Sequence, residues 1–183
     1  MLLYMSENSQ KIILKHYGIS PWEINVITSI LDKKFFVEYD EIENNFEDKF
    51  VSLIEIPFLY PFNEDFFKWF GHNEWEKFKG ILKEMKRRRG DGKAIKIDMS
   101  FSGEQKIKFL VELDEGQWFR TAIEKIDFVV ELLPYHLNPE KLPSNTTEII
   151  YEFDKDSARW RVNFVIANKQ KFVNSDDDWK VVI

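Results

Sequence analysis

The chain has 183 residues and a mass of 22.0 kDa, which fits one globular domain or two very small ones. Apolar residues make up 44% of the sequence and charged residues 32%, which excludes a collagen-like chain and argues against general disorder. The absence of cysteine excludes disulfides, thiol catalysis and cysteine-based metal sites. No apolar run is long enough for a transmembrane helix and no secretory signal is visible, so we expect a cytoplasmic protein.

The first third of the chain predicts two helices that meet at a turn. Residues 7–17 indicate a short helix, and Gly18 suits the position just after its end. Residues 20–23 read Ser-Pro-Trp-Glu, which matches a capping box with proline at the first helical position. This pattern predicts a second helix over 21–33.

Residues 11–27 resemble the helix-turn-helix motif, with Gly18 at the turn. The resemblance implies two crossing helices that share one apolar seam, and a second helix that reads DNA. That second helix carries Glu23 and Asp32, and no basic residue before Lys33. Because a helix beside phosphates should not be acidic, we expect a plain helical hairpin that packs on a sheet.

The middle of the chain predicts two strands followed by two helices. The strands cover 35–40 and 50–57, and the acidic turn 41–48 separates them. The helices cover 63–71 and 74–89, the second from apolar residues that step by three and four.

The rest of the chain predicts hairpins on either side of one helix. The expected elements are a hairpin of 93–101 with 106–113, a helix over 117–133, a hairpin of 148–153 with 159–167, and a last hairpin of 171–173 with 179–183. The pattern indicates an α+β fold with a mainly antiparallel sheet built from hairpins, and with helix 117–133 packed on one face. We expect one domain over 1–183, with a division into 1–90 and 91–183 as the alternative.

Residues 83–96 form a basic run in an otherwise acidic chain. Residues 61–100 carry 10 basic and 7 acidic side chains, whereas the whole chain has a net charge of −6. Arginine forks onto phosphate oxygens, and neighbouring rings can stack on bases, so the run predicts an anion or nucleic-acid site. The alternatives are a solvated helix end that offsets the helix dipole, and a contact for an acidic protein segment such as 38–48. The run comprises Lys83, Lys86, Arg87, Arg88, Arg89, Lys93 and Lys96.

Nine aromatic residues lie within 58–78, more than one helix face can bury. Core packing from two sides is one interpretation, and an exposed interface patch or an apolar ligand pocket are the others. For an interface or pocket the candidate residues are Phe62, Phe66, Phe67, Trp69, Phe70 and Trp75.

No catalytic or metal-binding motif is visible. The three histidines lack the spacing of metal ligands, and no glycine-rich phosphate loop occurs. The carboxylate clusters at 40–43, 114–115 and 176–178 lack the order of a calcium loop, and helix caps or solvated turns explain them more simply. We therefore expect no metal and no cofactor, and no catalytic residue can be named.

These features favour a non-enzymatic interaction module that binds a protein partner or self-associates. The first alternative is a nucleic-acid-associated protein, which requires residues 83–96 on one continuous exposed face. The second is an enzyme, which requires a pocket where carboxylates from distant segments meet.

Overall fold

Nine strands form one mixed sheet in the computed structural model, which describes residues 10–44, 49–176 and 178–182. In spatial order the strands are β2 (Phe36–Glu41), β1 (Lys11–Tyr17), β3 (Leu53–Phe58), β4 (Lys96–Phe101), β5 (Lys106–Val111), β6 (Thr146–Asp154), β7 (Arg159–Ala167), β8 (Gln170–Ser175) and β9 (Asp178–Val182).

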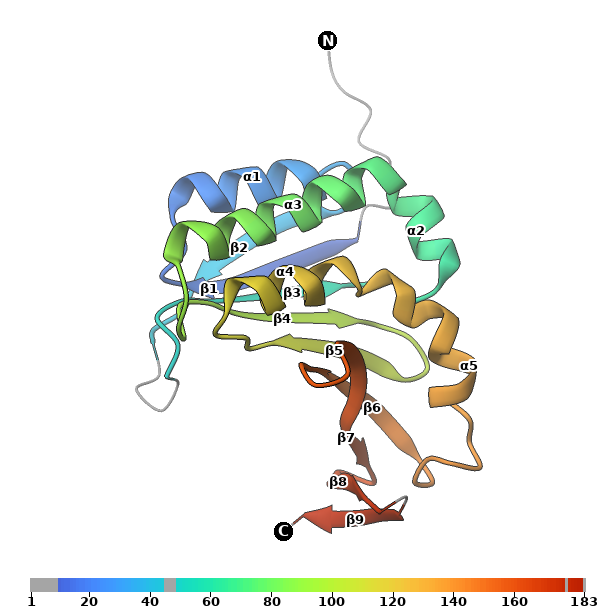
Figure 1. Cartoon of the computed structure of the whole chain (residues 1–183). Coiled ribbons are helices and arrows are strands. Elements are labelled where there is room, and N and C mark those ends of the chain that lie inside the picture. The colour runs from blue at the N-terminus through green and yellow to red at the C-terminus, as the bar shows by residue number, and fades with distance from the viewer. Residues whose placement is uncertain (1–9, 45–48, 177, 183) are drawn as a thin grey trace.

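The helices lie on one face of the sheet and leave the other face open, while β8 and β9 extend beyond the helices (Figure 1). They are α1 (Pro21–Leu31), α2 (Glu64–Phe70), α3 (His72–Arg89), α4 (Gly116–Glu124), the 3₁₀ segment η1 (Asp127–Leu132) and α5 (Leu133–His136). The strand side chains beneath them alternate with exposed ones, so that Ile12, Ile54, Ile97 and Phe109 join one apolar core.

The fold is α+β with a mostly antiparallel sheet, as the sequence predicts. It is not built from hairpins alone, however. The pairs β1–β2, β3–β4 and β5–β6 are parallel, and each pair is joined by a helical connection. Of the five remaining connections, four join consecutive strands that pair antiparallel. The fifth is the longer passage from β2 to β3, which places β3 antiparallel beside β1. The predicted acidic turn 41–48 lies in that passage and falls partly outside the described residues.

The predicted N-terminal helical hairpin is wrong, because residues 11–17 form β1 rather than a helix. Ile12 and Leu14 are buried in the core, whereas Lys11, Ile13 and Lys15 are exposed. This alternation has the two-residue period of a strand, and the β-branched isoleucines favour it. With no first helix, the helix-turn-helix resemblance carries no structural meaning in this chain.

The predicted helix over 117–133 is also shorter than expected. The α-helix ends at Glu124, and the chain continues as the tighter η1. Because a 3₁₀ helix has three residues per turn, Val129, three residues after Ile126, reaches the core. In α4, Phe119 and Ala122 are buried, and the Ala122 carbonyl accepts a hydrogen bond of 2.9 Å from Trp160 Nε1 of β7.

Candidate functional site

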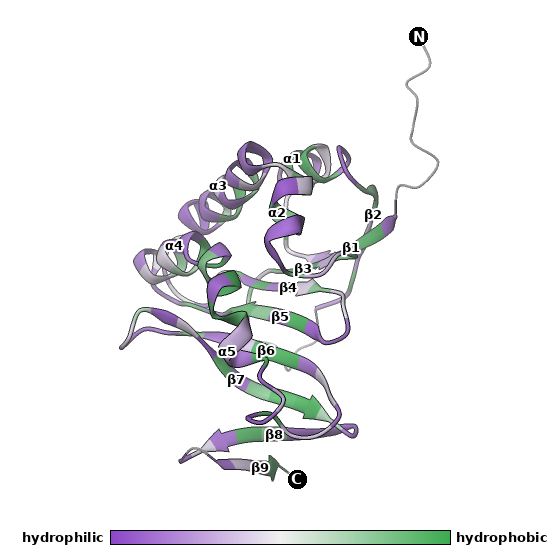
Figure 2. Ribbon diagram, turned by 90° about the vertical axis from the view of Figure 1, so that its right-hand side faces the viewer, coloured by the Kyte–Doolittle hydropathy of each residue, from purple (hydrophilic) through white to green (hydrophobic). Residues whose placement is uncertain are grey.

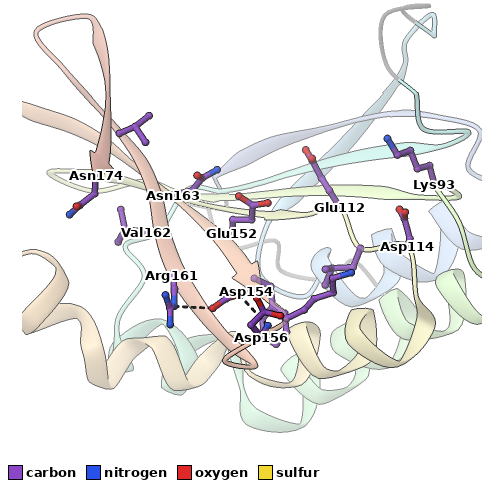
Figure 3. A pocket seen from close by; sticks show the side chains of 14 residues that line it. Lys93, Glu112, Asp114, Glu152, Asp154, Asp156, Arg161, Val162, Asn163 and Asn174 are labelled. Carbon is purple, nitrogen blue, oxygen red and sulfur yellow. Dashed lines mark hydrogen bonds and ion pairs between the residues drawn. The ribbon is translucent and has the colours of Figure 1, made fainter. Parts of the chain in front are cut away.

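An open groove of about 610 Å³ lies where the carboxyl ends of β5 and β6 meet (Figure 3). Because these two strands are parallel, the residues that end them emerge at the same edge of the sheet. Five carboxylates line the groove, which we call the acidic groove: Glu112, Asp114, Glu152, Asp154 and Asp156.

The acidic groove opens on the face of the sheet that has no helices. Glu152 on β6 is paired with Leu110 on β5, whereas the flanking residues Phe109 and Val111 point into the core. Glu112 is two residues beyond Leu110 and so lies on the open face as well. Figure 3 shows Glu112 and Glu152 projecting on the same side of the sheet.

Nearby cations neutralise part of the groove. Lys96 Nζ lies 3.0 Å from a Glu112 oxygen, and Arg161 Nε lies 3.1 Å from Asp154 Oδ2. Asp154 also accepts a hydrogen bond of 2.6 Å from Ser157 Oγ, and this bond, with Arg161 beside it, lowers the pKa of Asp154. The carboxylate of Asp154 therefore already has a cation, Arg161, and a hydrogen-bond donor, Ser157.

Glu152 has no cation partner among the described residues, unlike Glu112 and Asp154 on either side of it on the open face. The Glu152 side chain is exposed at the open face. Partial desolvation by the walls of the groove still raises the pKa of Glu152, and the negative charges of Glu112 and Asp154 raise it further. Both effects disfavour the ionised form. A cation brought to this carboxylate would relieve the repulsion.

The groove brings together carboxylates that are about 40 residues apart in the sequence. In the sequence, Asp114 is explained as a helix cap, and nothing connects it with Glu152, because that link depends on the pairing of β5 with β6. The sequence holds one signal for this groove: Asp114 and Asp154 each follow directly after a predicted strand, 106–113 and 148–153. In the described ranges 10–44, 49–176 and 178–182, no group of three or more His, Cys, Asp or Glu side chains could hold a metal ion.

The basic run does not form one exposed face. Lys86 is buried at 1% exposure and donates hydrogen bonds to the carbonyls of Gly92 and Asp114 at 2.9 and 2.7 Å. Arg89 is bound by Glu23, so these two cations are not available to phosphate groups. The other members contact neighbours too: Lys83 pairs with Glu124, Arg87 with Glu84 and Lys96 with Glu112, while Arg88 lies over Trp22 and Lys93 over Phe50.

The aromatic residues of 58–78 lie in and around the core between α2, α3 and the sheet. Phe58 sits at the centre, with its ring stacked on Phe101 at 4.8 Å. Among the candidate interface residues, four are almost fully buried and two are partly buried. The buried ones are Phe62, Phe66, Phe70 and Trp75, and the partly buried ones are Phe67 and Trp69.

No protein-family model, curated protein or solved structure matches this chain. None of the described helices is both long and apolar enough to cross a lipid bilayer. The candidate function therefore rests on the residues and geometry of the acidic groove.

Proposed function

We propose that the protein is a non-enzymatic binding module whose acidic groove receives a cationic side chain of a protein partner. The observation that carries this proposal is Glu152, a carboxylate without a cation partner among the described residues, held beside two like charges. A lysine or arginine of the partner would supply the missing charge. Arginine fits better, because its planar fork can bind two carboxylates at once.

The shape and charge of the groove support this role. Its volume of about 610 Å³ is within the usual range of binding pockets. The five carboxylates outnumber the three basic residues that line it, Lys93, Lys155 and Arg161, and Lys155 is itself paired with Glu115 outside the groove. The net charge of −6 would also accelerate the approach of a basic partner at low salt.

A titration followed by NMR tests the proposal. The probe is an acetylated and amidated Gly-Arg-Gly-Arg-Gly peptide, added to ¹⁵N-labelled protein. We expect amide shifts at residues 112–114 and 152–156, and a Kd that rises about three- to tenfold in Glu152→Gln, because the open groove weakens each ion pair.

Glu104→Gln is the matched control, since Glu104 is an exposed carboxylate at the β4–β5 turn. This variant makes the same charge change away from the groove and should keep the wild-type Kd. Unchanged affinity in Glu152→Gln, or shifts spread evenly over the surface, would contradict the proposal.

One observation favours acid–base catalysis as a second candidate. Glu152 and Asp154 lie in the same groove, yet the pKa of Glu152 is raised and that of Asp154 is lowered. Paired carboxylates with separated pKa values suit a general acid and a base or nucleophile. This candidate predicts turnover of chromogenic glycosides or esters that Glu152→Gln abolishes, whereas a binding module turns over none of them.

A further inference from the structure

A β-bulge decides which residue of β7 lies opposite Glu152. Strands β6 and β7 lie side by side, and one turn joins them (Figure 2). Between two consecutive residues of β6, the pairing skips from Phe164 to Val162, so Asn163 is an extra residue on β7. An unbroken register would bring Val162 opposite Glu152, whereas the bulge places Arg161 there. β-Bulges are common beside active sites, where they redirect a side chain.

Arg161 lies within reach of two carboxylates. Glu152 and Asp154 are two residues apart on β6, so both side chains project from the open face of the sheet. Side chains directly opposite each other in an antiparallel pair have Cβ atoms about 4.5–5.5 Å apart, which a long arginine side chain easily spans. In the structure Arg161 instead turns along the strand, and its Nε lies 3.1 Å from Asp154 Oδ2 (Figure 3).

The contact between Arg161 and Asp154 is easily exchanged. The Arg161 side chain is 65% exposed, and a solvent-exposed ion pair contributes little to stability. Asp154 does not need this cation to keep its position. Its Oδ1 accepts a hydrogen bond of 3.2 Å from the Asp156 backbone N–H, and its Oδ2 accepts one of 2.6 Å from Ser157 Oγ. Asp154 is therefore fixed, while Arg161 can turn.

Glu152 is the other carboxylate that can receive Arg161. It has no cation partner among the described residues, and the charges of Glu112 and Asp154 repel its ionised form. A move of Arg161 from Asp154 to Glu152 exchanges one exposed ion pair for another, so the two positions differ little in free energy. Arg161 on Glu152 would occupy the carboxylate that a partner's cation needs.

We propose that Arg161 is an internal competitor of the partner's cation for Glu152, and that Asp154 holds Arg161 away from it. The acidic groove accepts a cation while Arg161 is on Asp154, and it is blocked when Arg161 is on Glu152. The inference rests on the proposed function and adds its regulation. Any change that frees Arg161 from Asp154 should lower the affinity of the groove.

A double-mutant cycle on Asp154 and Arg161 tests the inference, with the Gly-Arg-Gly-Arg-Gly peptide as the probe. Asp154→Asn should raise the Kd about tenfold, because it removes a carboxylate and also releases Arg161 onto Glu152. In an Arg161→Gln background the same substitution should raise the Kd less than about threefold, since only the carboxylate is lost. Asparagine keeps an oxygen for the Asp156 N–H, so the turn after β6 is preserved.

NMR titration of the Glu152 carboxyl gives a second measurement that needs no peptide. The pKa of Glu152 should fall in Asp154→Asn, and it should fall less when Arg161→Gln is also present, because the competing cation is then missing.

Arg159→Gln is the matched control background. Arg159 is an exposed arginine of the same strand, and it lies outside the acidic groove. In this background Asp154→Asn should keep its full effect on the Kd and on the pKa of Glu152.

The outcomes separate the inference from the proposed function. If Asp154→Asn has the same effect with and without Arg161, on the Kd and on the pKa of Glu152, the competition is overturned. The acidic groove then remains the binding site, provided that Glu152→Gln still weakens binding. Coupled changes in the pKa without any peptide binding would overturn the proposed function and the competition together. Weaker binding in Arg161→Gln alone would show that Arg161 holds the partner, which also overturns the inference.

Discussion

The guanidinium of Arg89 binds the carboxylate of Glu23 through two parallel hydrogen bonds, Nη1 to Oε1 at 2.7 Å and Nη2 to Oε2 at 2.8 Å. The residues are 66 positions apart, and the pair joins the start of α1 to the end of α3. Glu23 is 2% exposed, so the pair is held where water hardly reaches it. Such a pair orients two elements, and it is costly to break from one side.

Arg89→Met should lower the free energy of unfolding by about 3 kcal/mol, because it leaves the buried Glu23 carboxylate without its cation. Urea denaturation at pH 7 measures this change. Arg87→Met is the control, since Arg87 binds Glu84 at the exposed surface and its loss should cost less than about 1 kcal/mol. Equal effects of the two substitutions would show that the Glu23 pair has no special role.

The same pair predicts a loss of stability in acid. Burial by itself would raise the pKa of Glu23, but hydrogen bonds from Arg89 and Ser20 outweigh it and lower the pKa from 4.5 to about 2. The folded state therefore binds this proton less tightly than the unfolded state does. The contribution of Glu23 is complete above pH 4.5 and is lost as the pH falls towards 2. The slope of unfolding free energy against pH should be shallower in Glu23→Gln than in the wild type.

His16 is a buried polar group that weakens the fold. Neither ring nitrogen has a hydrogen-bond partner within the described residues. Burial lowers the pKa of His16, although Glu41 and Asp40 act in the opposite direction. The titration of His16 should therefore not reduce the free energy of unfolding above pH 6.5. Below pH 6.5 that free energy should fall, because the unfolded state takes up the proton on His16 more readily than the folded state does.

His16→Phe should raise the free energy of unfolding by about 1 kcal/mol, since it removes an unsatisfied buried group and keeps a ring near Tyr39. The gain should be larger at pH 5.5 than at pH 7.5. Burial lowers the pKa of His136 too, so part of the pH dependence should remain in the variant. A gain that is the same at both pH values would contradict the titration of His16.

Gly18 should not tolerate a side chain. Its φ is +64°, and an added Cβ would lie 2.6 Å from the Val51 carbonyl oxygen. Gly18→Ala should cost about 1–3 kcal/mol, measured by thermal unfolding. Gly80→Ala is the contrasting control, because a Cβ there meets no atom within 4 Å and alanine favours the helix by about 1 kcal/mol. A neutral Gly18→Ala would argue against the tight turn between β1 and α1.

Local signals predicted the elements that depend on neighbouring residues. Helix α1 begins as expected, because Ser20 and Glu23 form both hydrogen bonds of a capping box. The predicted hairpins of 93–101 with 106–113 and of 148–153 with 159–167 also form, as β4 with β5 and β6 with β7, since short connections leave few alternatives.

Long-range pairing decided the rest. Residues 11–17 have apolar spacing that fits a helix as well as a strand, and their place between β2 and β3 selects the strand. The acidic groove requires β6 to lie parallel to β5 after a helical connection, and nothing near Glu152 in the sequence reports that arrangement. The bulge at Asn163 likewise appears only once the register of β6 with β7 is known.

The helix-free face of the sheet bears on how the molecules stay apart from one another. Ion pairs cross this face between adjacent strands, from Lys11 to Glu38 at 2.8 Å and from Lys108 to Asp98 at 3.1 Å. Stacking two such faces would strip water from these charges without offering them better partners. These ion pairs therefore discourage face-to-face stacking of two sheets where they lie, while a partner can still reach the acidic groove on the same face.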